Sequence, residues 1–116
     1  MQIKSHQRTQ LKSAELISNE ILIQSIEDGT SLMGDLYYQG YDRIIIYEQN
    51  LTSDFFDLKT KMAGEILQKF SNYRMRLAIV GDFSKNTSKS FNDFKFECNK
   101  AKQIHFAGSL DEVLEA

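Results

Sequence analysis

A chain of 116 residues can form one domain that buries roughly two-thirds of its unfolded surface, so neither a disulfide nor a structural metal is required for stability. The formal net charge of -2, with acidic and basic residues interspersed, argues against nucleic acid or an anionic membrane as the main partner. The single cysteine excludes an internal disulfide, and no apolar stretch is long enough for a membrane span or a signal peptide, which predicts a cytoplasmic protein.

The first part of the chain predicts two strands and a helix. The segment Gln2 to Thr9 contains one strong apolar residue, so we expect an edge strand that pairs antiparallel with a second strand at Ala14 to Ile17. The apolar residues 21–23 either prolong that second strand or begin the next helix. This helix is predicted from Ile26 to Gln39, with Gly40 as its C-terminal stop.

The central part of the chain predicts a strand, a long helix and another strand. The runs Ile44 to Tyr47 and Leu77 to Val80 lack polar alternation, which is typical of strands covered on both faces. The segment Asp54 to Asn72 keeps a helical period and is too long for a hairpin. We therefore expect the two strands to be parallel and joined by a right-handed crossover.

The last part of the chain follows the same pattern. After the polar loop at 81–90, we expect a helix from Ser90 to Lys100, a strand from Gln103 to Ala107 and a short helix opened by the capping box at 109–112. Cys98 shares the apolar face of its helix, which predicts a packed thiol. The sequence thus predicts one α/β domain with the order β-β-α-β-α-β-α-β-α, helices on both faces and a mostly parallel sheet of four to five strands, in which the last three strands are mutually parallel.

The segment FFDLKTKMAGEILQKFSNYRMRLAIVGDFSKNTSKS, together with FKFECNK and IHFAGSLDEVLEA, resembles the bacterial family of uncharacterised proteins called domain of unknown function 4180. The resemblance implies a bacterial single-domain protein and assigns no catalytic residue. The element order also resembles STAS domains, the sulfate-transporter and anti-sigma-factor-antagonist modules, which bind partners and are not enzymes. In many STAS domains a phosphorylatable Ser or Thr begins the helix after the third strand. Thr52 and Ser53 occupy the matching turn, without the Asp-Ser-Ser-Gly type sequence of that family.

A candidate ligand site follows from the parallel sheet. Ligands of such sheets bind outside the carboxyl ends of the strands, where helix N-termini and lysines favour a small anion such as phosphate. Lys59 falls within the core stripe of the predicted long helix, so it either extends along the surface or points into this crevice, where Glu48 or Asp82 would pair with it. Ser, Thr, Asp and Gly also serve as helix caps and turn residues, so a purely structural role for these residues is the alternative. The candidate ligand-binding residues are Thr52, Ser53, Lys59, Asp82, Ser84 and Lys85.

A candidate interface lies on the opposite side of the same helix. Gly64 forms a column of small residues with Thr60 and Ser71 and costs about 1 kcal/mol relative to alanine without a local reason. Close approach of a second subunit or of another element of the chain would supply that reason.

The sequence lacks the residues that metal binding, nucleotide binding or serine hydrolysis would require. With one cysteine and two histidines there is no pair at metal-binding spacing, so no metal is expected and His105 is predicted to be an ordinary strand residue. The Walker, Gly-x-Gly-x-x-Gly and Gly-x-Ser-x-Gly motifs do not occur, and no cofactor is expected. A binding or regulatory module that docks a protein partner or a second copy is therefore favoured over an enzyme. The alternative is a protein or enzyme for a small anion or phosphorylated metabolite.

Overall fold

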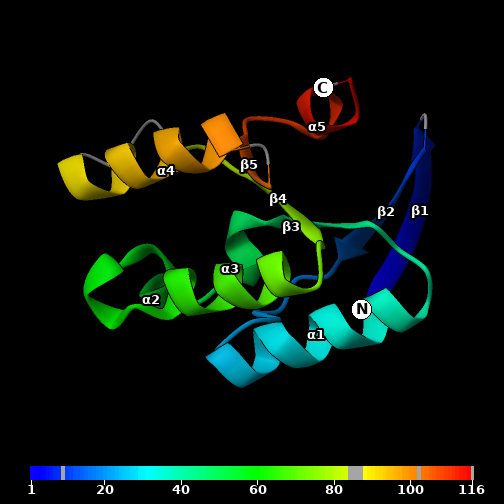
Figure 1. The fold of residues 1–116 in the computed structure, drawn as a ribbon, viewed down its shortest axis with the longest axis horizontal. Helices are drawn as coiled ribbons and strands as arrows, with labels where there is room; N and C mark the ends of the chain where they lie inside the picture. The colour runs from blue at the N-terminus through cyan, green and yellow to red at the C-terminus, as the bar shows by residue number, and fades with distance from the viewer. Residues whose placement is uncertain (9, 84–87, 102, 116) are drawn as a thin grey trace.

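The computed structural model of the protein describes residues 1–8, 10–83, 88–101 and 103–115. These residues form a five-stranded sheet in the order β1-β2-β3-β4-β5, with helices on both faces (Figure 1). The strands are β1 (Gln2–Arg8), β2 (Leu11–Ile17), β3 (Arg43–Tyr47), β4 (Arg76–Val80) and β5 (Ile104–Ala107). The helices are α1 (Ile26–Tyr38), α2 (Ser53–Phe56), α3 (Met62–Asn72), α4 (Lys89–Ala101) and α5 (Leu110–Glu115).

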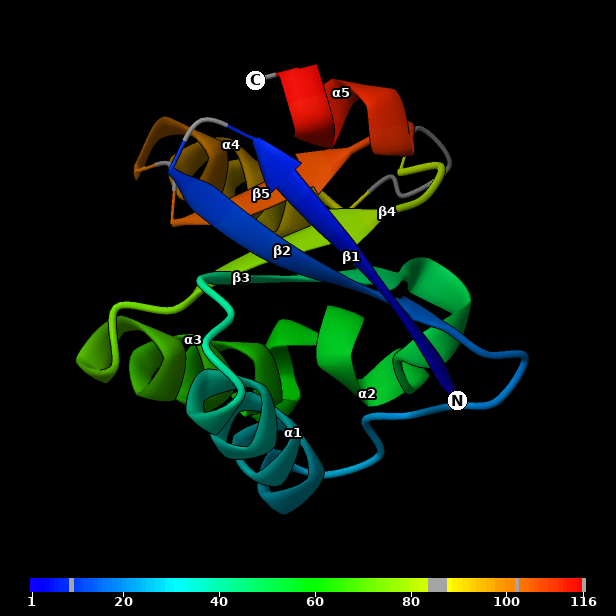
Figure 2. The same cartoon turned by 90° about the vertical axis from the view of Figure 1, so that its right-hand side faces the viewer.

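The pairing of the strands confirms the predicted α/β class and element order. β1 is antiparallel to β2, and the pairs β2–β3, β3–β4 and β4–β5 are parallel. Because the order of the strands follows the chain, successive crossovers move in one direction, and right-handed crossovers then place their helices on one face of the sheet. α1, α3 and α4 accordingly share one core, and α5 lies on the other side (Figure 2).

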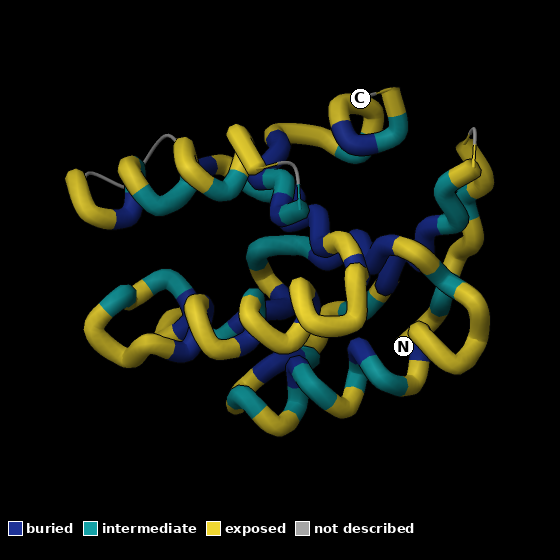
Figure 3. Tube along the Cα trace, in the orientation of Figure 1, coloured by how far each residue is buried: buried dark blue, intermediate teal, exposed yellow. Residues whose placement is uncertain are grey.

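Alternation along the strands divides the interior into two unequal cores. On the first face, side chains such as Ile44 and Leu77 pack with those of α1, α3 and α4. On the second face, Ile45 and Ala78 pack against Val113 of α5. α5 is only six residues long, so it covers a part of this second face. Burial also differs between the strands, because β1 is largely exposed whereas the central strands β3 and β4 are buried (Figure 3).

The prediction of one continuous helix from Asp54 to Asn72 is wrong for the first half of this segment. The chain forms the short helix α2 and then a 3-10 turn, and α3 begins only at Met62. The Oγ1 atom of Thr60 lies 2.8 Å from the carbonyl oxygen of Asp57 and competes with the helical bonds of this segment. Lys61 then takes a left-handed conformation with φ of 62°, which ends the turn and separates it from α3.

The ambiguous segment 21–23 belongs neither to β2 nor to α1. Ile23 is buried and pairs in parallel with Leu51 in an isolated bridge. Asn50, which is fully buried, holds this region in place. Its side chain accepts a hydrogen bond from the Tyr47 amide at 3.2 Å and donates two to carbonyl oxygens of the loop after β2, at 2.9 and 2.8 Å.

Candidate functional site

The residues predicted to bind an anion at the carboxyl ends of the strands do not share one structural setting. Thr52 and Ser53 lie at the start of α2, which has only four residues and therefore a small dipole. Lys59 is exposed on the 3-10 turn, so its predicted place in the core stripe is wrong, and among the described residues it pairs with neither Glu48 nor Asp82. Ser84 and Lys85 lie outside the described residues. Binding at this end of the sheet stays a prediction.

The predicted interface column is divided between two elements. Gly64 and Ser71 are exposed on α3, whereas Thr60 belongs to the preceding turn, where its hydroxyl is engaged with the backbone. An ideal Cβ atom at Gly64 would have no neighbouring atom within 4 Å. A shallow hollow of about 350 Å³ adjoins it, with Leu58 and Phe94 among its lining residues.

Buried polar side chains gather instead on the second face of the sheet. Ser13, Glu15 and Arg43 are each no more than 7% exposed, and alternation places all three on the side that α5 covers in part. They stand at positions of β2 and β3 where a fully covered face would carry apolar residues. Burial of such groups is unfavourable unless they form hydrogen bonds. These three residues form their hydrogen bonds in two separate clusters.

The first cluster is centred on Glu15. Its Oε2 atom accepts a hydrogen bond from the Tyr47 hydroxyl at 2.6 Å, and its Oε1 atom lies 2.9 Å from Nε2 of His6. Burial by itself would raise the pKa of Glu15, but the hydrogen bonds from Tyr47 and His6 outweigh it and lower that pKa. Burial and the neighbouring carboxylate raise the pKa of Tyr47 to about 12. Both oxygens of Glu15 are therefore occupied, and the cluster ties β1 and β3 to β2.

The second cluster contains two arginines. Arg43 and Arg76 begin β3 and β4 and lie directly opposite each other in the parallel register. The buried Arg43 guanidinium donates from Nε to the Ser13 hydroxyl at 2.8 Å and from a terminal nitrogen to the carbonyl oxygen of Val113 at 3.3 Å. Arg76 is exposed. No described carboxylate lies within 4.0 Å of either guanidinium.

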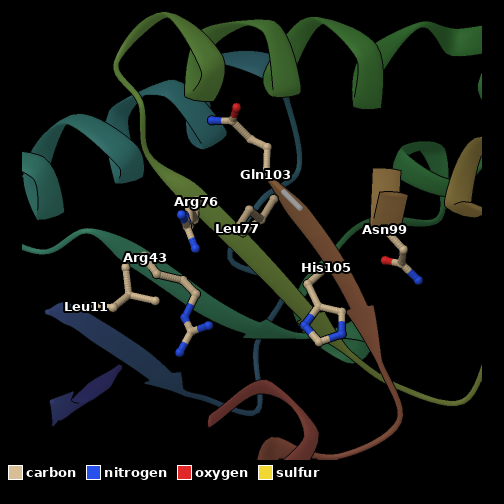
Figure 4. Close-up of a pocket in the computed structure, with 7 residues that line it drawn as sticks. All are labelled: Leu11, Arg43, Arg76, Leu77, Asn99, Gln103 and His105. Carbon is tan, nitrogen blue, oxygen red and sulfur yellow. The ribbon is translucent and has the colours of Figure 1, made fainter. Parts of the chain in front are cut away.

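These arginines border a cavity of about 330 Å³ on the second face. In Figure 4 the side chains of Arg43, Arg76 and His105 extend from three neighbouring strands around this cavity. Burial and the charge of Arg76 lower the pKa of Arg43, and burial and the charge of Arg43 lower the pKa of His105. A guanidinium keeps its proton in proteins, so two fixed positive charges and a neutral imidazole surround the cavity at neutral pH. The lining residues are Leu11, Arg43, Arg76, Leu77, Asn99, Gln103 and His105.

The cavity lies at the amino ends of β3 and β4, the edge opposite to the one predicted from the sequence. Its charged residues were missed because each arginine stands at the first position of its strand, where a polar flank is ordinary. The sequence signal that exists is the repeated arginine before each apolar run, at Arg43 and Arg76. Only the register shows that these two residues meet.

Comparison with known proteins now places the chain. The family described as Domain of unknown function (DUF4180) matches residues 8–116, which include β2 to α5 and the whole arginine cavity. The chain belongs to the DUF4180 family. The resemblance to this family stated from the sequence is thereby confirmed, and the matched segment of this DUF4180 protein begins at Arg8. No curated protein matches the chain.

The described part of the DUF4180 domain offers few reactive groups. None of its described residues form a cluster of three or more metal-ligating side chains. Cys98 packs against the first core, as predicted, and burial raises the pKa of its thiol to about 11. None of the described helices is long and apolar enough to cross a membrane. The Arg43–Arg76 cavity is therefore the feature of this domain with the clearest chemistry, which is attraction of an anion.

Proposed function

We propose that this DUF4180 protein is a non-catalytic binding module whose ligand is a small anion held between Arg43 and Arg76. The observation that supports it is the placement of Arg43 and Arg76 at paired positions of β3 and β4, with no described carboxylate within 4.0 Å of either guanidinium. Burial and the charge of Arg76 lower the pKa of Arg43, so the two like charges repel each other. An anion between the two groups would replace this repulsion with two charge-assisted contacts.

Binding is favoured over catalysis because of the other residues around the cavity. Its described lining contains no serine, cysteine or carboxylate, so His105 has no neighbour there to activate as a nucleophile. A STAS-like regulatory role, in which a cytoplasmic protein partner distinguishes the occupied from the empty module, is the finer form of this proposal. Thr52 and Ser53 would be the positions for phosphorylation in that role, because they occupy the turn after β3.

Calorimetric titration with inorganic phosphate tests the proposal. Arg76→Ala should weaken binding by roughly 1.5 to 3 kcal/mol, or about ten- to a hundredfold, because it removes one charge-assisted contact. Lys59→Ala is the matched control, since it also removes one exposed positive charge but at the carboxyl end of the sheet. It should leave the affinity unchanged.

Two results would contradict this assignment. No binding of phosphate or of a panel of phosphorylated metabolites by the native protein would exclude the anion-binding function. Weakening by Lys59→Ala with no effect of Arg76→Ala would move the site to the carboxyl ends, where Thr52, Ser53 and Asp82 lie.

A second proposal concerns self-association through the exposed face of α3. Gly64 has open space where a side chain would stand, and the hollow beside it exposes Leu58 and Phe94. A second copy of this chain would fill the space and account for the small residue.

Light scattering should show a mass above that of the monomer, and Gly64→Arg should reduce this mass. Gly34→Arg is the matched control, because Gly34 is also a helical glycine with open space around it, on α1. A native protein that is monomeric at all concentrations would exclude this interface.

A further inference from the structure

The charge of the arginine cavity favours one class of anion. Arg43 and Arg76 carry two permanent positive charges, and His105 adds none at neutral pH because its pKa is lowered. A phosphate monoester carries about -1.5 to -2 charges at neutral pH and has three terminal oxygens, whereas a carboxylate carries one charge and has two. A monoester therefore neutralises both guanidinium groups, and a carboxylate leaves one uncompensated.

The two arginines differ in how they are held, which suits capture of such a group. Arg43 is held in one orientation by its bonds to Ser13 and Val113, and the structure gives its remaining N–H groups no partner among the described residues. A fixed guanidinium fork loses little entropy when it binds oxygen atoms. Arg76 is exposed and can close over the ligand from the neighbouring strand.

The polar amides around the cavity are already engaged elsewhere. The Asn99 amide accepts from the backbone nitrogen of Phe106 at 2.8 Å and donates to its carbonyl oxygen at 3.4 Å, so it acts as a strand partner for the outer edge of β5. The Gln103 amide nitrogen donates to the carbonyl oxygen of Met75 at 2.7 Å. A ligand rich in hydroxyl groups would find few free amide N–H donors on these walls, and unpaired polar groups weaken binding.

The cavity has space beyond a phosphate group. Its volume of about 330 Å³ lies at the lower end of the range for small-molecule sites, roughly 300 to 1,000 Å³. The side chain of Leu11 at the start of β2 lines this space, whereas the side chain of Leu77 packs in the first core on the other face. A compact apolar group would contact the half-buried Leu11, whereas inorganic phosphate would leave it uncovered.

We propose that the ligand is the phosphate monoester of a compact apolar group, with its phosphate between Arg43 and Arg76 and its organic part against Leu11. This proposal rests on the anion-binding function proposed above and names the class of ligand that the same site takes.

Calorimetric titration of the native protein with phenyl phosphate, glucose 6-phosphate, inorganic phosphate and benzoate tests the ligand class. Phenyl phosphate should bind at least about tenfold more tightly than each of the other three, since only it combines a dianionic group with an apolar body. Arg76→Ala should weaken the phenyl phosphate complex about ten- to a hundredfold.

Variants of β2 test the position of the organic group. Leu11→Ser should remove most of the preference for phenyl phosphate over inorganic phosphate, because it removes an apolar wall of the cavity. Leu11 is half-buried and lies outside both cores, so the variant should fold. Ile17→Ser is the matched control at the other end of the same strand, on the same face and outside the cavity, and it should keep the preference.

The possible failures are distinct. If phenyl phosphate and glucose 6-phosphate bind equally well and Arg76→Ala weakens both, the apolar ligand class is wrong and the anion-binding function stands. If benzoate binds as tightly as phenyl phosphate, the requirement for a dianion is wrong. If none of the four compounds binds, both the ligand class and the proposed function are wrong.

Discussion

Arg43 shows most clearly that this chain keeps a charged residue where its fold would accept an apolar one. The side chain is 7% exposed and is followed by a run of buried isoleucines in β3. Its bonds to Ser13 and Val113 satisfy part of the guanidinium, but burial without a carboxylate partner is unfavourable. A residue kept for ligand binding would explain this arrangement, and stability alone does not.

Arg43→Met should separate these two roles. We expect its free energy of unfolding in urea to differ from that of the native protein by less than about 1 kcal/mol, because relief of burial and of repulsion from Arg76 offsets the lost hydrogen bonds. Phosphate binding should be lost. A decrease in stability of more than about 3 kcal/mol would instead assign Arg43 a structural role.

Glu15 predicts a dependence of stability on pH. Its pKa in the folded protein is lowered below the ordinary 4.5, so its contribution is present above that value and is lost as the pH falls through the folded-state pKa. Glu15→Gln, which loses charge-assisted bonds to Tyr47 and His6, should lower the free energy of unfolding by roughly 2 kcal/mol at neutral pH. This difference should shrink at pH values below 4.5.

Urea titrations across this pH range measure the effect of Glu15. Glu20→Gln is the control, because Glu20 is exposed in the loop after β2 and its side chain forms no ion pair among the described residues. An equal loss of stability by Glu15→Gln at neutral and acid pH would show that ionisation of Glu15 is not involved.

At the scale of single elements, the helices show where local sequence and packing disagree. The period of the segment after β3 favours a helix throughout, yet Thr60 and Asp57 bond to the local backbone and Lys61 turns the chain before α3. The break places Phe55 of α2 in the core, fully buried. Side-chain contacts of this kind decide helix boundaries that periodicity cannot resolve.

Two helical glycines should respond to the same substitution in opposite directions. Gly64→Ala should raise the free energy of unfolding of the monomer by about 0.5 to 1 kcal/mol, since alanine favours the helix and open space receives the methyl group. Gly29→Ala should lower it, because the new Cβ would lie 3.0 Å from Cδ1 of Ile66, whose side chain is fully buried and cannot withdraw. Thermal unfolding measures both. A destabilising Gly64→Ala would indicate a close neighbour on that face.

At the scale of the whole molecule, the sheet is protected unevenly. β3 and β4 pair with a strand on each side and are buried over nearly their whole length, whereas β1 pairs with β2 alone and is mostly exposed. The cavity lies where the short α5 leaves the second face partly uncovered. The fold therefore combines a buried central pair of strands with the arginine cavity beside them.

Hydrogen exchange measured by NMR should show this difference. The paired amides of β3 and β4 should exchange only through global unfolding, and those of β1 that bond to β2 should exchange through local opening at a free energy at least about 2 kcal/mol lower. Protection of β1 equal to that of β3 would mean that the antiparallel ribbon unfolds together with the core.

The sequence alone predicted the α/β class, the element order and the parallel central strands, because these depend on local signals. Apolar runs such as Ile44 to Tyr47 reveal buried strands, and residues such as Gly40 mark the ends of elements. The sequence also placed a site at the carboxyl ends around Thr52 and Lys59, from a general rule for parallel sheets. None of the residues around the arginine cavity was selected, and His105 was expected to be an ordinary strand residue.

The tertiary structure decided which residues meet. Arg43 and Arg76 become neighbours because strand register is set by packing of the whole sheet, and a shift of one residue would place them on the other face. The length of α5 then leaves the space beside them unfilled. Register and coverage depend on contacts between distant parts of the chain, so periodicity and composition, which are local, do not determine them.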